Sequence, residues 1–166
     1  MYPKKMKYLI TILLICFYGN YAFGETPVDS VIVKKSEKKM YLYQCGKILK
    51  EYRVSFGANP KGHKQQEGDE RTPEGNYLLD YKKSDSSFYK AIHISYPNQA
   101  DIENARKKNV GPGGQIMIHG QKNGFGSLSF IAQRFNWTDG CIAVTNKEMD
   151  EIWKLVEVNT PISIEK

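Results

Sequence analysis

Cysteine and histidine are scarce in this sequence, and they are not arranged in pairs. Of its 166 residues, three are Cys and three are His. There is no Cys-x-x-Cys pair and no pair of closely spaced histidines, which are the arrangements that usually hold zinc. We therefore expect no metal site.

Long apolar runs are also rare, and the longest one stands near the N-terminus. Residues 8–18 are uncharged and mostly apolar, they follow a lysine-rich start, and small residues occupy positions 22 and 24. The run is shorter than the about 20 apolar residues that cross a bilayer. We expect residues 1–24 to be a cleaved signal peptide, followed by one domain at residues 25–166 without stable membrane insertion. A short anchor that stays attached is the alternative.

No compact basic patch with interleaved aromatic residues is present, although the net charge is +6. Lys4, Lys5 and Lys7 lie in the expected signal peptide with no acidic residue beside them, which leaves +3 for the rest of the chain. Nucleic-acid-binding proteins concentrate positive charge on one face. A mild and scattered excess therefore argues against nucleic acid as a partner.

Two cysteines, Cys45 and Cys141, remain once Cys16 leaves with the signal peptide. In an oxidising compartment the two can form a disulfide, and on the sequence alone this alternative stays open. Cys45 lies in YQCGKI, which has the pattern of a hairpin turn. Cys141 follows Gly140 and precedes an apolar run, where it is either a small buried residue or a nucleophile at the start of a strand.

Apolar residues that alternate or run together predict β-strands through most of the chain. SVIVKK, KMYLYQ and ILKEYRVSFG form a first group, NYLLDYK and FYKAIHIS a second pair, and QIMIHG, CIAV and TPISIE the last. A long polar loop at residues 57–75 separates the first group from the second, and loops of this length are usually functional or mobile. The pattern predicts a mainly β domain of about seven or eight strands, with helices at its margins.

Three helices are expected. The first has Asn98 as its cap, and its apolar side consists of Ala100, Ile102 and Ala105. The second is the short stretch SLSFIAQRF at residues 127–135. The third, NKEMDEIWKLVEV, takes Asn146 as its cap and should pack on the sheet through Ile152 and Trp153.

Two strand ends carry reactive side chains: IMIHG ends on His119 and Gly120, and Cys141 opens CIAV. A cysteine attacks as the thiolate, so it needs a base nearby, and a histidine can take the thiol proton and later return it to a leaving amine. His119 and Cys141 are 22 positions apart, so they can meet only if their strands lie side by side. Taken singly, each also fits a purely structural role, as a packed histidine or a small core residue.

Taken together, these motifs resemble a known family. IHG followed by GCI is similar to the signature of the YkuD-type L,D-transpeptidase catalytic domain. RTPEGNY, YPN and GPGGQIMIHG match in the same order, so the resemblance covers roughly residues 30–166. WTDGCIAV and the helix after it resemble the periplasmic YafK-like branch. The resemblance implies a β-sandwich or flattened barrel with a few peripheral α-helices.

The resemblance also implies a role for each residue of the motif. Cys141 matches the nucleophile and His119 the general acid and base. Gly120 matches the residue whose backbone carbonyl orients the imidazole. Gly140 and Cys141 match the positions whose N–H groups form the oxyanion hole. No cofactor is implied.

Two positions depart from the commonest family pattern, which has a histidine before the Gly-Cys pair and an arginine two residues after the cysteine. Asp139 and Ala143 stand there instead, which leaves open how a substrate carboxylate is held. Arg71 is a candidate because a guanidinium can bind a carboxylate through two hydrogen bonds. Trp137 and Asp139, next to the nucleophile, are further candidates for substrate binding. His93 is expected to be a packed or rim histidine, and His63 a solvated loop residue.

The expected function is that of a peptidoglycan L,D-transpeptidase, acting in the periplasm or cell-wall space on stem peptides through a thioester acyl-enzyme. The acceptor is another stem peptide or the terminal lysine of a wall-anchored lipoprotein. The motif does not distinguish transfer from hydrolysis, so a carboxypeptidase, or a hydrolase that releases wall-linked lipoprotein, is the first alternative. An inactive peptidoglycan-binding module is the second.

Overall fold

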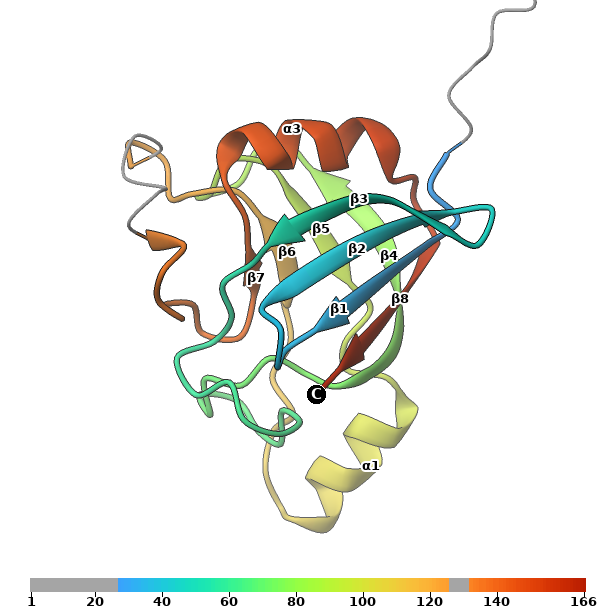
Figure 1. Cartoon of the computed structure of the whole chain (residues 1–166). Coiled ribbons are helices and arrows are strands. Elements are labelled where there is room, and N and C mark those ends of the chain that lie inside the picture. The colour runs from blue at the N-terminus through green and yellow to red at the C-terminus, as the bar shows by residue number, and fades with distance from the viewer. Residues whose placement is uncertain (1–26, 126–131) are drawn as a thin grey trace, which may run out of the picture.

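The computed structural model describes residues 27–125 and 132–166, and in these two ranges it contains one eight-stranded sheet and two helices (Figure 1). The strands are β1 (Ser30–Lys34), β2 (Lys39–Gln44), β3 (Lys47–Arg53), β4 (Gly75–Lys83), β5 (Ala91–Ile94), β6 (Met117–His119), β7 (Ile142–Ala143) and β8 (Thr160–Glu165). The helices are α1 (Gln99–Lys107) and α3 (Asn146–Leu155).

The first three strands form an antiparallel meander, as the sequence pattern predicted. β1 pairs with β2 and β2 with β3, and the turn between the last two contains Cys45 and Gly46. Both residues have positive φ, 51° and 72°, which a two-residue hairpin turn of this kind requires. Cys45 is exposed, and the two cysteines in the described ranges, Cys45 and Cys141, are both free. The disulfide alternative is therefore wrong.

The sheet has the order β3-β2-β1-β8-β4-β5-β6-β7 and curls until its two outer strands meet. After β3 the chain continues to Ser55, which forms an antiparallel bridge with Ala143 of β7. Ser55 N–H donates to Ala143 O and Ala143 N–H donates to Ser55 O, each at 2.9 Å. The expected mainly β fold is confirmed, in the form of a curled, barrel-like sheet.

The core lies inside the curl. Strands from both halves contribute side chains that are fully buried, among them Val33, Met40, Leu42, Leu79, Ile92, Ile118 and Ile142. Helix α3 lies across one open end of the curl in Figure 1 and adds Met149 and Ile152, while Trp153 is partly buried against the same core. The predicted packing of this helix through Ile152 and Trp153 is confirmed.

The helix caps show one success and one error of sequence reasoning. Asn98 caps α1 in a full capping box with Asp101, as predicted, although Ile102 is 43% exposed and does not belong to the buried side. Helix α3 is capped by Thr145 and not by Asn146, because Thr145 and Glu148 form a capping box. Helix α3 ends at Leu155, three residues before the end of the predicted stretch. Most of the short helix expected at residues 127–135 lies outside the described residues.

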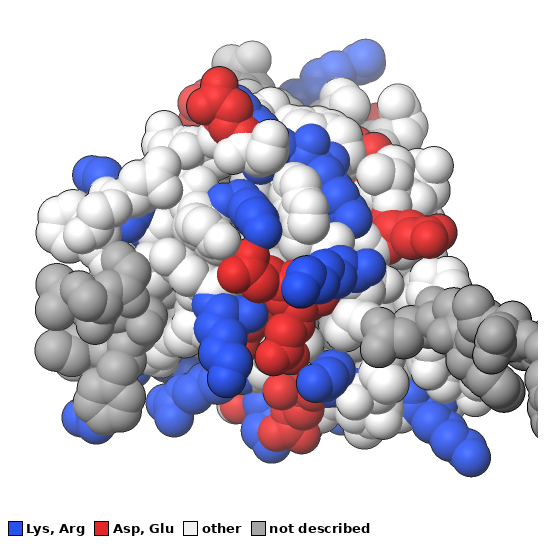
Figure 2. Space-filling model, turned by 90° about the horizontal axis from the view of Figure 1, so that it is seen from above, with Lys and Arg blue, Asp and Glu red and all other residues white. Residues whose placement is uncertain are grey.

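Acidic and basic side chains are interspersed on the face that carries α3 (Figure 2). Two ion pairs join the helix to the sheet region: Lys90 to Asp150 at 2.5 Å and Lys50 to Glu151 at 3.3 Å. Lys82 Nζ also donates to the carbonyl of Trp153 at 2.7 Å. These contacts hold α3 over the end of the curled sheet. Within residues 27–125 and 132–166, no helix combines the length and apolar character that a membrane span needs.

Candidate active site

Strands β6 and β7 bring His119 and Cys141 to the same region of the molecule. The two strands are parallel neighbours, with Ile118 opposite Ile142 and His119 opposite Ala143. Side chains that face each other across a ladder point to the same side of the sheet, and so do residues two apart along one strand. His119, Ala143 and Cys141 therefore share one side. The prediction that the two strands lie side by side is confirmed.

Cys141 is half-buried at the point where the chain enters β7. Its Sγ lies 3.6 Å from the carbonyl of Gln115, a contact in which the thiol donates. Burial raises the pKa of the thiol, the backbone N–H of Met117 lowers it, and the Asp139 and Lys64 charges then act in opposite directions, with a net rise. In this state the sulfur is an uncharged thiol that needs a base to become a nucleophile.

His119 is buried between two aromatic rings. The Phe88 ring lies 4.1 Å from the imidazole, measured between centroids, and the Trp137 ring meets it edge-on at 5.9 Å. Burial lowers the pKa of His119 to about 4, against a smaller opposing effect of the Gly120 carbonyl. The imidazole is therefore neutral at neutral pH and able to accept a proton.

The carbonyl of Gly120 fixes the tautomer of that imidazole. His119 Nδ1 lies 2.6 Å from Gly120 O, and a carbonyl only accepts, so the hydrogen is assigned to Nδ1. The lone pair is then on Nε2. A Cβ at Gly120 would lie 2.7 Å from Asn146 Oδ1 and 2.8 Å from Tyr89 O, so this backbone can approach its neighbours closely because it carries no side chain.

The turn before Cys141 also depends on a glycine. Gly140 has φ +130°, a value that other residues rarely adopt, and a Cβ there would lie 2.7 Å from Arg71 O. Its N–H donates to Thr138 Oγ1 at 3.2 Å, and the same hydroxyl donates to Cys141 O at 2.7 Å. The N–H that the resemblance assigns to an oxyanion hole is thus engaged within the turn in this state.

The loop at residues 57–75 packs against this turn, but its basic residues point in different directions. Arg71 Nη1 donates to His63 O at 3.5 Å, which directs the guanidinium toward His63, and its Nε is buried without a hydrogen-bond partner among the described residues. Lys64 is buried and forms an ion pair with Asp69 at 2.8 Å. Lys64, and not Arg71, is the loop cation that acts on the thiol of Cys141.

The other two substrate-binding candidates, Trp137 and Asp139, lie just before Cys141 in the sequence. The indole Nε1 of Trp137 is buried and, within the described ranges, has no hydrogen-bond partner, so it remains available as a donor. Asp139 is exposed and raises the pKa of the Cys141 thiol. Trp137 and His119 are in contact, and Arg71 reaches the site through its backbone at Gly140.

Three residues near the site were not singled out by sequence reasoning: Phe88, Lys64 and Thr138. Phe88 is the first residue of the predicted strand FYKAIHIS, where an aromatic residue is normally taken as part of the hairpin. Lys64 stands in a polar loop, where lysines are usually solvated. Thr138 lies two residues before Gly140, and a Thr-x-Gly turn is the one local signal that could have identified it.

Two histidines outside the site have structural partners. His93 Nδ1 lies 2.7 Å from Asp80 Oδ1, and its ring stacks on Tyr81 at 4.5 Å. This is the packed or rim position expected for His93. His63 Nε2 lies 3.1 Å from Asp101 Oδ1, and its Nδ1 accepts from the N–H of Glu74 at 3.0 Å, so it ties the loop to α1. The expectation of a solvated His63 is wrong.

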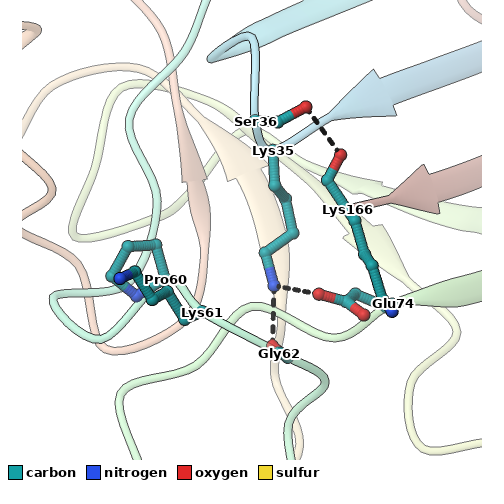
Figure 3. A pocket seen from close by; sticks show the side chains of 7 residues that line it. All are labelled: Lys35, Ser36, Pro60, Lys61, Gly62, Glu74 and Lys166. Carbon is teal, nitrogen blue, oxygen red and sulfur yellow. Dashed lines mark hydrogen bonds and ion pairs between the residues drawn. The ribbon is translucent and has the colours of Figure 1, made fainter.

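A separate cavity of ≈ 400 Å³ lies on the far side of the same loop (Figure 3). It is lined by Lys35, Ser36, Pro60, Lys61, Gly62, Glu74 and Lys166. The buried Lys35 ammonium at its wall donates to Gly62 O, Thr72 O and Glu74 Oε1, and Ser36 Oγ donates to Lys166 O. The lining holds neither a thiol nor an imidazole, and no cluster in residues 27–125 and 132–166 has the His, Cys, Asp or Glu groups to hold a metal ion.

The fold and this site define a mainly β domain with a thiol and a neutral imidazole on adjoining strands. The sequence model of the L,D-transpeptidase catalytic domain, YkuD, matches residues 29–164. The chain belongs to this family.

Individual relatives agree with that assignment. YafK of Escherichia coli (strain K12), named as a proposed L,D-transpeptidase, is 32% identical over 128 residues, which cover 74% of this chain and 44% of that protein. The crystal structure of Pgp2 from Campylobacter jejuni, a helical cell shape determining protein, has a TM-score of 0.63 at 28% identity and covers 86% of this chain and 49% of that one.

An L,D-transpeptidase structure from Xylanimonas cellulosilytica has a TM-score of 0.55 at 13% identity, which shows the shared fold, and covers 85% of this chain and 62% of that one. The chain spans about half the length of the curated relatives it matches.

Proposed function

We propose that this protein is a peptidoglycan L,D-transpeptidase in which Cys141 is the nucleophile and His119 the general acid and base. The observation that carries the proposal is the neutral imidazole of His119, held by Gly120 O on the same side of the sheet as the thiol. A buried thiol with a raised pKa cannot ionise alone, so its activation requires a base of this kind.

The first half-reaction transfers the thiol proton to His119 Nε2 as Sγ attacks the peptide carbonyl between an L-centre and a D-residue of a stem peptide. The backbone N–H of Cys141 donates to the resulting oxyanion, joined by Gly140 N–H once this group turns from Thr138 Oγ1. Collapse of the tetrahedral intermediate expels the amine, which takes the proton from His119 and leaves a thioester on Cys141.

The second half-reaction decides the product. An amine from another stem peptide, or from the terminal lysine of a wall-anchored lipoprotein, gives a new amide bond, whereas water gives a hydrolysed stem. Hydrolysis is the second candidate, because the exposed Asp139 carboxylate stands next to the nucleophile where the commonest family pattern has a basic residue. A negative charge there does not help to hold an acyl donor through its carboxylate.

Two buried N–H groups from segments near the Gly140 turn are candidate donors for substrate binding. Arg71 Nε and Trp137 Nε1 are buried N–H groups that no group in the described parts of the chain satisfies. An unsatisfied buried donor costs about 1–3 kcal/mol, which a bound carboxylate or amide oxygen would recover. We assign Arg71 and Trp137 to substrate binding on this ground, with Asp139 beside them.

The location follows from the substrate. Peptidoglycan lies outside the inner membrane, and residues 1–24 have the composition of a signal peptide, so we propose export to the periplasm or cell-wall space. The mechanism needs no cofactor, since every step uses a side chain or backbone group of this chain. An inactive wall-binding module is the competing interpretation, but such a module has no need of a thiol and a neutral imidazole on one side of the sheet.

Purified protein incubated with tetrapeptide muropeptides and with lipoprotein-linked sacculi tests the proposal, with products identified by mass. New cross-links support transfer, whereas release of D-alanine or lipoprotein without exchange assigns hydrolysis instead. Cys141→Ala should abolish either product, and Cys45→Ala, which removes the exposed thiol in the hairpin turn, should leave it unchanged. Full activity of Cys141→Ala would refute the proposed nucleophile, and a carbapenem adduct absent from Cys141 would favour the binding module.

A further inference from the structure

Two buried lysines hold the loop at residues 57–75, and they differ in how many acceptors each one has. Lys35 Nζ has three, from Gly62, Thr72 and Glu74, so all the protons of its ammonium are used. Lys64 is just as buried, with 3% of its side chain exposed, but among the described residues its Nζ has the single acceptor Asp69. Two of the three ammonium protons of Lys64 therefore have no acceptor among the described residues, while the Asp69 carboxylate balances its charge.

The Asp69 carboxylate is itself held by the backbone, so it anchors Lys64 rigidly. It accepts from the N–H groups of Gln65 at 2.7 Å, Gln66 at 3.2 Å and Arg71 at 3.1 Å. Burial would raise the pKa of Asp69, but these hydrogen bonds and Lys64 hold it below its usual value, so the carboxylate stays charged. The ion pair is a fixed part of the loop and not a solvated contact.

Two close backbone approaches connect this ion pair to the segments that surround Cys141. On one side, Lys64 Cε lies 3.4 Å from the position a Cβ on Gly113 would take, and Gln115, two residues further on, contacts Cys141 Sγ at 3.6 Å through its carbonyl. On the other side, Arg71, which donates to Asp69, packs its carbonyl against Gly140. Lys64 thus lies behind the backbone that surrounds the sulfur.

Among the charged groups near the sulfur, Lys64 differs from the others in its effect on a negative sulfur. His119 on β6 is neutral until it receives the proton, and Asp139 on the same turn as Cys141 opposes a negative sulfur. Glu67 lies beside Lys64 against the same glycine, with its Cα 3.2 Å from the position of a Cβ on Gly113, but it is not among the charged groups that act on the Cys141 thiol. The cation that favours a negative sulfur in this resting state is Lys64.

We propose that Lys64 is an electrostatic positioning residue of the nucleophile: its ammonium, anchored by Asp69 behind Gly113, stabilises the negative charge that forms on Cys141 Sγ when the proton leaves. This inference rests on the proposed function, because it presumes that Cys141 is the nucleophile. The buried location matters, since an ammonium out of water acts over several ångströms with little screening.

The test measures how the rate of Cys141 alkylation by iodoacetamide depends on pH in the full-length protein. The alkylated peptide is identified and quantified by mass spectrometry. Removing the Lys64 charge in Lys64→Met should slow alkylation at pH 7 by about three- to tenfold and move the midpoint of the pH profile upward. Asp69→Asn keeps an acceptor for the backbone but frees Lys64 from its counter-charge, so it should act in the opposite direction and speed alkylation by about two- to threefold. A structural role alone would change both variants in the same direction.

Lys35→Met is the matched control, because it removes an equally buried lysine of the same loop without a charge near the sulfur. It should leave the midpoint unchanged. An unshifted midpoint in folded Lys64→Met, or a shift common to Lys64→Met and Lys35→Met, would refute the proposal. If Lys64→Met does not fold, Asp69→Asn alone decides the question. An alkylation midpoint in Asp69→Asn that is unchanged or higher than in the parent protein would then refute the proposal. Since alkylation needs no peptidoglycan, its outcome is independent of whether the protein is a transpeptidase.

Discussion

The curled sheet has two halves that differ in the length of their strands. β1, β2, β3, β4 and β8 have 5 to 9 residues each, whereas β6 has three and β7 two. The proposed nucleophile and base both lie in the short-strand half. There the backbone leaves the ladder after two or three pairs and turns toward the sulfur and the imidazole, as Gly120, Gly140 and Gln115 do.

The same contrast holds for buried polar groups. Lys35, at the end of β1 in the long-strand half, has three acceptors for its three protons. In the short-strand half Trp137 Nε1 has none among the described residues, and neither has Arg71 Nε of the loop that packs on it. Complete satisfaction favours stability, and unsatisfied donors are available to a ligand. The two halves should therefore respond differently to substitution.

Histidines on the neighbouring strands β5 and β6 give the largest contrast. We expect His119→Ala to reduce the rate of Cys141 acylation by a carbapenem or stem peptide by about 10²–10⁴-fold, because the thiol loses its base. His93→Ala, one strand away, should keep the rate within about threefold while lowering the melting temperature. Stopped assays measure the acylation rate, and circular dichroism measures the melting temperature. An equal loss of rate in the two variants would contradict the different roles assigned to His119 and His93.

Replacement of Lys35 should show the opposite response. Lys35→Met leaves Gly62 O, Thr72 O and the Glu74 carboxylate without their donor, so we expect unfolding free energy to fall by roughly 2–4 kcal/mol in urea titrations. Lys34→Met is the control, because Lys34 is only half-buried and pairs with Glu37 at the surface, and it should change stability by less than about 1 kcal/mol. If Lys35→Met kept its full unfolding free energy but lost most of its acylation rate, the assignment of Lys35 to stability would be refuted.

The smallest effect is expected at Phe88, and it depends on pH. Burial holds the pKa of His119 at about 4 instead of 6.5, so the neutral base persists in acid and the rate should fall only as pH drops through about 4. Phe88→Ala admits water to the imidazole, which favours the charged form and moves the acid limb upward toward 6.5. The rate at pH 5 should then fall several-fold more than at pH 8. Phe88→Leu, which keeps an apolar cover, should shift the limb less, and an unshifted limb in Phe88→Ala would refute the role of the ring.

Local patterns predicted the elements of this fold well. The meander, the β4–β5 pair, the Asn98 cap and the α3 stripe all follow from the spacing of apolar residues and caps, which act within a few residues. The error at Asn146 is of the same local kind: Thr145 and Asn146 are both good caps, and Glu148 three residues after Thr145 decides between them.

Contacts between distant loops could not be predicted in this way. Nothing near Phe88 in sequence shows that it covers His119, and nothing near Lys64 shows that it turns inward while Arg71 points toward His63. These positions depend on how the loop at residues 57–75 packs on Gly113 and Gly140, which brings together segments 40 to 80 residues apart. The resemblance to a family supplied the pairing of His119 with Cys141, but not the groups that surround it.

The bridge between Ser55 and Ala143 also bears on how a peptide can reach Cys141. A strand of two residues at the end of a sheet would normally offer its free edge to an incoming peptide, which could then bind by adding a strand. Here Ser55 takes both the N–H and the carbonyl of Ala143, so that edge is already paired. The stem peptide that we propose as substrate would be unable to extend the sheet at this position, so its recognition would depend on its side groups and termini.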